Sequence, residues 1–194
     1  IESAGDPFDL FLGLDRGTTT LIAGPCAVES EEQIERIAGT LAKVGVRFLR
    51  GGAFKPRTSP HAFQGIGHEA LGWMRRAADR HGMYVVTEAL SEFDVEGVAR
   101  AADVIQIGSR NMANFALLRA VGKASKPVLL KRGAAATLDE WLLAAEHLYV
   151  HGAAGVVFCE RGVRTFDGAT RNMVDIGGVA LLASVRGLPV VVDP

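Results

Sequence analysis

Cysteine, net charge and long apolar runs are all scarce in this chain of 194 residues. Its two cysteines cannot build the disulfide framework of a small secreted domain. The formal net charge of -1, with bases and acids interspersed, argues against a nucleic-acid-binding protein. No apolar run is long enough to cross a membrane, and no signal-peptide pattern opens the chain. We therefore expect a globular cytoplasmic protein that uses neither nucleic acid nor membrane as a partner.

The sequence repeats one pattern, in which short apolar runs alternate with amphipathic stretches. The strand-like runs are 21–23, 48–50, 84–87, 104–107, 128–131, 155–159 and 189–193, and the helix-like stretches are 31–44, 65–81, 91–101, 114–121, 138–151 and 173–185. This alternation predicts parallel strands with crossover helices. The strands are apolar throughout, as expected when both faces of a sheet are covered.

Three end signals support these helices. Ser30 is a plausible N-cap for the first helix, and Gly82 fits the end of the second. Thr137 and Glu140 have the spacing of a capping box.

Two architectures fit this pattern, a (β/α)₈ TIM barrel and an open doubly wound sheet. The first strand is not followed by a Gly-rich turn of the dinucleotide-binding kind, which favours the barrel. We predict an N-terminal extension over 1–19, with a small hairpin as its candidate structure, and a single α/β barrel domain with catalytic function over 20–194. Seven strands alone would leave two unpaired edges. We therefore expect this domain to be C-terminally incomplete, with an eighth strand and the last helices missing or supplied from elsewhere.

The loop over 50–60 concentrates cations, glycines and hydroxyls directly after an apolar run. Arginine forks and a lysine charge suit small anions, and Gly51 and Gly52 allow the backbone to approach a ligand closely. This composition predicts an anion site. The alternative is an ordinary solvated basic loop.

Polar residues also follow most of the other strands, at the end where barrels build their active sites. Eight cations would converge there: Arg50, Lys55, Arg57, Arg110, Lys131, Arg132, Arg161 and Arg164. Burying so much positive charge without anions would be costly. We therefore expect two phosphorylated ligands, or a phosphate and a carboxylate. The alternative for one or two of these arginines is an ion pair with a glutamate such as Glu88 or Glu160.

Cys26 follows the first strand, within Gly24-Pro25-Cys26. A lone cysteine is usually a small core residue. Beside cations it could instead be a thiolate that serves as a metal ligand or nucleophile. Cys159 lies in an apolar run and is interpreted as packing, and no histidine has metal-ligand spacing with Cys26.

Five ordered motifs carry a family resemblance: 23–30, 50–60, 106–111, 129–133 and 159–166. From about residue 20 to 194 the chain resembles the 3-deoxy-D-arabino-heptulosonate 7-phosphate (DAHP) synthases, in the compact subclass related to the octulosonate 8-phosphate synthases. Several long motifs in order are more specific than one short motif. The Lys-Pro-Arg-Thr sequence at 55–58 is similar to the DAHP branch.

The resemblance implies a (β/α)₈ barrel that condenses phosphoenolpyruvate with erythrose 4-phosphate, the first step of the shikimate pathway, in a homo-oligomer. Arg110, Lys131 and Arg161 would bind phosphoenolpyruvate, and Arg50 and Lys55 would lie near its carboxylate. Arg57, Thr58 and Ser59 would bind the aldose phosphate.

For the chemistry, the resemblance implies Lys55 and Glu88 as catalytic residues. It makes Cys26 one ligand of a divalent metal, Mn²⁺ or a similar ion, whose other ligands would follow Pro194. Two alternatives remain open: a sister synthase that uses another phosphorylated aldose, and a non-catalytic anion-binding barrel.

Overall fold

The computed structural model describes residues 19–193, so the predicted N-terminal hairpin lies outside the described residues. The described residues form two compact units, 19–106 and 107–193, and each is presented by itself. Both are built from parallel strands and intervening helices, as the alternating pattern predicts.

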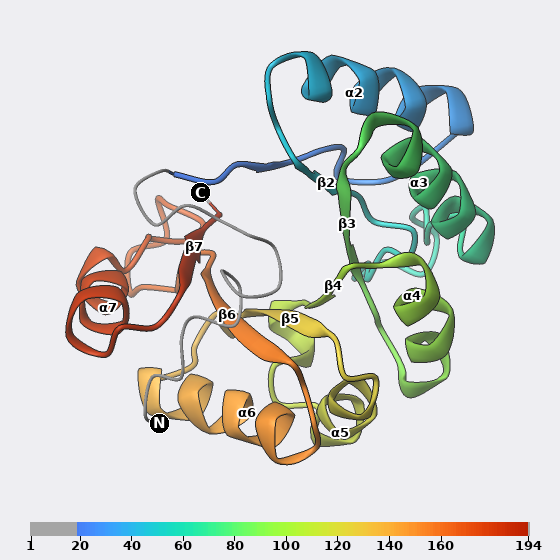
Figure 1. Ribbon diagram of the computed structural model, residues 1–194. Coiled ribbons are helices and arrows are strands. Elements are labelled where there is room, and N and C mark those ends of the chain that lie inside the picture. The colour runs from blue at the N-terminus through green and yellow to red at the C-terminus, as the bar shows by residue number, and fades with distance from the viewer. Residues whose placement is uncertain (1–18, 194) are drawn as a thin grey trace. The chain divides into compact units, whose positions relative to one another are not determined.

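The first unit contains three strands and all but the last residue of a fourth, which pair in parallel and in sequence order (Figure 1). They are β1 (Ile22–Ala23), β2 (Phe48–Arg50), β3 (Tyr84–Glu88) and β4 (Val104–Ile107). The helices are α2 (Glu31–Lys43), α3 (His68–His81), the short 3₁₀ turn η1 (Glu92–Asp94) and α4 (Val95–Ala101). Phe48, Leu49, Val85 and Ile105 are fully buried, so the strands supply much of this unit's core.

The second unit continues the same alternation with β5 (Pro127–Lys131), β6 (Gly155–Glu160) and β7 (Val190–Val192), again parallel and in sequence order. Its helices are η2 (Ser109–Asn111), α5 (Phe115–Lys123), α6 (Leu138–Val150), α7 (Ile176–Ala180) and the π-helical turn η3 (Leu181–Val185). Trp141 of α6 packs edge-on against Phe158 of β6, with ring centroids 5.1 Å apart. Its indole N–H donates to the Leu130 carbonyl at 3.1 Å, which satisfies the buried polar atom of a large apolar side chain.

The predicted helix ends are confirmed. The Ser30 hydroxyl accepts a hydrogen bond from the Gln33 N–H at 3.1 Å. Gly82 ends α3 in the left-handed conformation, with φ +65°. Thr137 and Glu140 form the reciprocal capping box at the start of α6.

Helices α3 and α7 each begin three residues later than predicted. The helix expected from residue 65 begins at His68, because Gly65 and Gly67 have φ values of +100° and +83° and cannot continue a right-handed helix. The helix expected from residue 173 begins at Ile176, because Asp175 is its N-cap and accepts a hydrogen bond from the Gly178 N–H. No helix in residues 19–193 is long and apolar enough to span a membrane.

Candidate functional site

The predicted site residues divide between the two units. The first unit contains Cys26, Arg50, Lys55, Arg57, Thr58, Ser59 and Glu88, and the second contains Arg110, Lys131 and Arg161. Most of them follow the carboxyl ends of strands, where barrel enzymes position their reactive groups.

In the first unit, Lys55 reaches back from the loop after β2 to the residue that follows β1. Its Nζ atom donates to the Cys26 carbonyl oxygen at 2.7 Å and lies 3.2 Å from the Cys26 sulfur. The hydrogen bond from Lys55 is the largest cause that lowers the pKa of the Cys26 thiol, and the charges of Lys55, Arg50 and Arg57 lower it further. Because Cys26 is exposed, this is an accessible thiol held toward its thiolate form.

Cys159 has the opposite environment. It lies in β6 and is buried, and burial raises the pKa of its thiol to about 12. A neutral buried thiol behaves as a small apolar side chain, so the interpretation of Cys159 as packing is confirmed.

Arg50 lies at the end of β2, close to the backbone that follows β1. Its guanidinium donates to the Pro25 carbonyl oxygen at 3.0 Å. A Cβ atom added to Gly24, whose φ is +151°, would lie 1.8 Å from the Arg50 carbonyl oxygen. Only glycine therefore permits this approach of the two strand ends.

The loop after Lys55 is closed at its base. Phe54 and Gly65 form an isolated antiparallel bridge, and the Lys55 N–H donates to the Gln64 carbonyl oxygen at 2.8 Å. The Gln64 side chain donates to the carbonyls of Ser59 and Ala62, at 3.2 and 2.7 Å. These bonds give the loop a defined shape before any ligand binds.

The tip of this loop carries Arg57, Thr58 and Ser59, all of which are exposed. Arg57 Nε donates to the Phe63 carbonyl oxygen at 3.4 Å, a long contact that occupies one of its five N–H donors. A guanidinium with most donors facing solvent suits recognition of a phosphate.

Glu88 is the last residue of β3. Its carboxylate accepts a hydrogen bond from the Gln106 side chain at 3.2 Å. The neighbouring Thr87 hydroxyl is buried and donates to the Gly51 carbonyl at 2.7 Å. The first contact connects Glu88 to β4, and the second connects Thr87 to the segment after β2.

In the second unit, Lys131 forms an ion pair with Asp193, the residue after β7. Arg161 follows β6 and donates to the Gly162 carbonyl at 3.3 Å. Arg110 lies on η2 and is exposed. The hydroxyl of Ser109 beside it is the one buried side-chain N or O atom in residues 19–193 without a hydrogen-bond partner.

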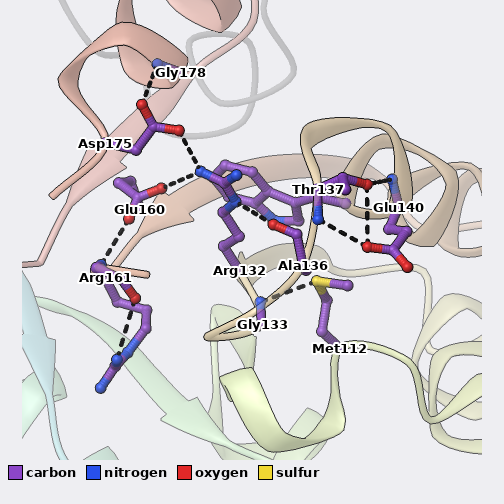
Figure 2. Close-up of polar contacts among 12 residues, drawn as sticks. Met112, Arg132, Gly133, Ala136, Thr137, Glu140, Glu160, Arg161, Asp175 and Gly178 are labelled. Atoms are coloured by element: carbon purple, nitrogen blue, oxygen red, sulfur yellow. Dashed lines mark hydrogen bonds and ion pairs between the residues drawn. The ribbon is translucent and has the colours of Figure 1, made fainter. Parts of the chain in front are cut away.

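Arg132 differs from its predicted role. The sequence places it among the cations that face an anion, but its side chain is only 7% exposed and forms ion pairs with Glu160 at 3.0 Å and Asp175 at 2.8 Å (Figure 2). The alternative of an ion pair with Glu160 is therefore confirmed for Arg132. Sequence reasoning missed Asp175, although an aspartate immediately before a helix is a recognisable N-cap signal.

Residues 19–193 contain no cluster of three or more His, Cys, Asp or Glu side chains that could hold a metal ion. Within this part of the chain, Cys26 is thus a candidate for a single ligand and not for a complete site.

Comparison with known proteins decides the family. Residues 7–194 match the model of the DAHP synthetase I family. The chain belongs to the DAHP synthetase I family. Because this match covers nearly the whole chain, the resemblance found in the sequence motifs is confirmed.

Within this family the chain is similar to the phospho-2-dehydro-3-deoxyheptonate aldolase of Thermotoga maritima, with 52% identity over 93% of this chain and 54% of the relative. It is also similar to a 2-dehydro-3-deoxyphosphooctonate aldolase of Acidithiobacillus ferrooxidans, with 31% identity over 89% of this chain and 63% of the relative. The chain therefore spans about half the length of the first relative and less than two thirds of the length of the second.

Solved structures agree with this placement in the DAHP synthetase I family. The crystal structure of the T. maritima DAHP synthase superimposes with a TM-score of 0.85 and 51% identity, over 92% of this chain and 52% of that one. A truncated form of the T. maritima synthase gives a TM-score of 0.82 and 49% identity, over 92% of this chain and 65% of that one. The predicted α/β class with the (β/α)₈ barrel architecture is confirmed.

Proposed function

We propose that this chain is the part of a DAHP synthase that carries most of its substrate-binding residues. The enzyme condenses phosphoenolpyruvate with erythrose 4-phosphate to give DAHP and inorganic phosphate, the first step of the shikimate pathway. Identity supports the heptonate branch, since it is 52% to a heptonate aldolase and 31% to an octonate aldolase. We further infer a cytoplasmic homo-oligomer.

The observation that carries this proposal is the contact between Lys55 and Cys26. It joins the Lys-Pro-Arg-Thr loop to an accessible thiol of lowered pKa, so a cation and a soft metal donor lie 3.2 Å apart. A structural cysteine would be buried and neutral, as Cys159 is. A cation beside an accessible thiol of lowered pKa suits a reaction between an anionic substrate and a polarised carbonyl group.

The predicted binding residues divide between the two substrates. Arg110, Lys131 and Arg161 bind the phosphate of phosphoenolpyruvate, while Arg50 and Lys55 lie near its carboxylate. Arg57, Thr58 and Ser59 bind the phosphate of the aldose. Fixed cations stabilise the negative charge that gathers on the leaving phosphate without reorganising during the reaction.

In the reaction, C3 of phosphoenolpyruvate forms a bond to the aldehyde carbon, the π electrons of the aldehyde move to its oxygen, which takes a proton and becomes a hydroxyl group, and C2 becomes electron-poor. Glu88 orders the water that adds to C2, after which the C–O bond to phosphate breaks and inorganic phosphate departs. The half-buried carboxylate of Glu88, oriented by Gln106, is suited to hold this water and accept its proton.

The thiol of Cys26 fits a divalent metal, because a thiolate is a metal donor and Lys55 favours the thiolate. A divalent ion bound there would supply Lewis-acid polarisation of the aldehyde oxygen. Orientation of the two substrates falls to the cationic side chains.

Phosphate release from phosphoenolpyruvate tests the proposal. The full-length protein is incubated with Mn²⁺ and either erythrose 4-phosphate or arabinose 5-phosphate, and inorganic phosphate is measured. We expect turnover with erythrose 4-phosphate and little with arabinose 5-phosphate. The reverse preference would assign the protein to the octonate branch, and no release with either aldose would overturn the proposal.

A further inference from the structure

The guanidinium of Arg132 is the centre of a buried polar network in the second unit (Figure 2). Its Nε atom donates to the Ala136 carbonyl at 3.0 Å, and one terminal nitrogen donates to both Glu160 and Asp175. The group also lies over the ring of Trp141, with 5.7 Å between Cζ and the ring centroid. Burial alone would lower the pKa of Arg132, but the hydrogen bonds to Asp175 and Glu160 raise it above its usual value.

Glu160 uses its two oxygens in opposite directions. One accepts from Arg132 at 3.0 Å, and the other accepts from the Gly162 N–H at 2.6 Å. The Glu160 carboxylate thus joins the Arg132 guanidinium to the backbone N–H of Gly162, the residue directly after Arg161. The side chain of Glu160 is 1% exposed, so no water competes for these bonds.

The backbone at Gly162 is constrained by its conformation and by close packing against Asn172. Gly162 has φ +89°, and a Cβ atom there would lie 2.8 Å from Cβ of Asn172. With the Asn172 amide oxygen turned toward Arg161, the Arg161 guanidinium donates to it at 3.0 Å. The Arg161 side chain is therefore held by Gly162 and Asn172, and the Gly162 backbone is in turn held by the Glu160 carboxylate.

Asp175 receives the other branch of the network, which leads away from Arg161. One of its oxygens accepts from Arg132 at 2.8 Å, and the other accepts from the Gly178 N–H at 2.8 Å to cap α7. Glu160 and Asp175 therefore both bind Arg132 but lead to different parts of the unit. Glu160 is next to Arg161 in the sequence, whereas Asp175 caps the start of α7.

We propose that Arg132 is a positioning residue that fixes Arg161 for phosphate binding, through Glu160 and the Gly162 N–H. This inference rests on the proposed function, in which Arg161 contacts the phosphate of phosphoenolpyruvate. Arg132 acts through its neighbours, because its side chain is only 7% exposed and its Nε atom and one terminal nitrogen donate inside the network. Lysine keeps the charge, but its donors radiate from a single nitrogen, so Arg132→Lys does not reproduce the separate contacts that Nε and the terminal nitrogen make.

The test compares phosphoenolpyruvate binding by calorimetry and the KM of both substrates in the full-length protein. We expect Arg132→Lys to weaken phosphoenolpyruvate binding by about tenfold and to leave the KM of erythrose 4-phosphate unchanged. The matched control Asp175→Asn loses stability but keeps the affinity for phosphoenolpyruvate. Arg161→Met removes the phosphate contact itself and gives the largest loss of phosphoenolpyruvate affinity expected from this position. If Arg132→Lys does not fold, Glu160→Gln supplies the same comparison.

Equal phosphoenolpyruvate affinity in Arg132→Lys and wild type would overturn the inference, as would equal weakening in Asp175→Asn. A wild-type protein that binds phosphoenolpyruvate but releases no phosphate would overturn the proposed function alone, because the binding comparison still decides the role of Arg132. A wild-type protein that does not bind phosphoenolpyruvate would overturn both.

Discussion

Lys55 Nζ lies 3.2 Å from the sulfur of Cys26 and donates to the carbonyl oxygen of the same residue at 2.7 Å. The two residues come from segments that follow different strands, and the contact converts a lone cysteine into an accessible thiol of lowered pKa. The pair connects the anion-binding loop with the candidate metal ligand.

Replacing Lys55 with methionine is expected to raise the pKa of Cys26 toward its usual value of 9.0, because the largest cause of the lowered pKa is removed. The midpoint of the alkylation rate against pH should move upward, since the thiolate is the reactive form. Iodoacetamide labelling with mass spectrometry measures this midpoint at Cys26. An unchanged midpoint would show that Lys55 does not control the thiol.

The two cysteines should respond differently to substitution. Cys26→Ser is expected to abolish most metal-dependent phosphate release while leaving the melting temperature near that of wild type, because Cys26 is exposed. Cys159→Ala should destabilise the fold by about 1–2 kcal/mol through a small cavity and retain turnover. Full activity with Cys26→Ser would exclude Cys26 as a metal ligand.

Arg57→Ala is expected to raise the KM of erythrose 4-phosphate by at least about tenfold, because one charged phosphate contact contributes more than 1 kcal/mol. The KM of phosphoenolpyruvate should change little. Steady-state kinetics with each substrate varied in turn measures both values. Lys126→Ala, a substitution at another cationic position, should change neither KM, and a rise in both for Arg57→Ala would contradict a role specific to the aldose.

Asp175→Ala is expected to destabilise the protein by at least about 1 kcal/mol at neutral pH, because it removes the α7 cap and one of the two carboxylates that pair with Arg132. The hydrogen bond from Arg132, followed by that from Gly178, holds the pKa of Asp175 below its usual 3.8. A carboxyl group whose pKa is lowered by folding stabilises the folded protein at a pH above the pKa that it has in the unfolded chain. This stabilisation is lost as the pH falls through the pKa of the group in the folded protein. In urea titrations from about pH 7 to pH 3, the difference in the free energy of unfolding between wild type and Asp175→Ala should therefore become smaller as the pH falls. A difference independent of pH would argue against a charge effect.

Gly24→Ala is expected to destabilise the protein by more than about 2 kcal/mol, because a Cβ atom would overlap the Arg50 carbonyl oxygen, which backbone pairing holds in place. Gly45→Ala is the control. Gly45 also has positive φ, at +79°, but a Cβ atom there meets nothing within 4 Å, so only the conformational cost of about 1 kcal/mol applies. Chemical denaturation measures both. Equal costs would show that the approach at Gly24 is not tight.

Local sequence signals predicted the elements well, because these signals act over a few residues. Phe48–Arg50 and Val104–Ile107 have the predicted bounds, and the Ser30 and Thr137 caps form as expected. The later starts of α3 and α7 depend on backbone conformation at Gly67 and on the Asp175 cap. Helical periodicity alone does not reveal either feature.

The sequence by itself determined the alternation of strands and helices, the family, and which residue types follow each strand, since all of these are patterns along the chain. Only the tertiary structure decided the partner of each charge. It assigned Arg132 to a buried network with Glu160 and Asp175 and placed Lys55 beside Cys26. These partners lie tens of residues apart in the sequence. Packing at the strand ends selects among many possible pairs, because a buried charge must find a partner whereas an exposed one need not.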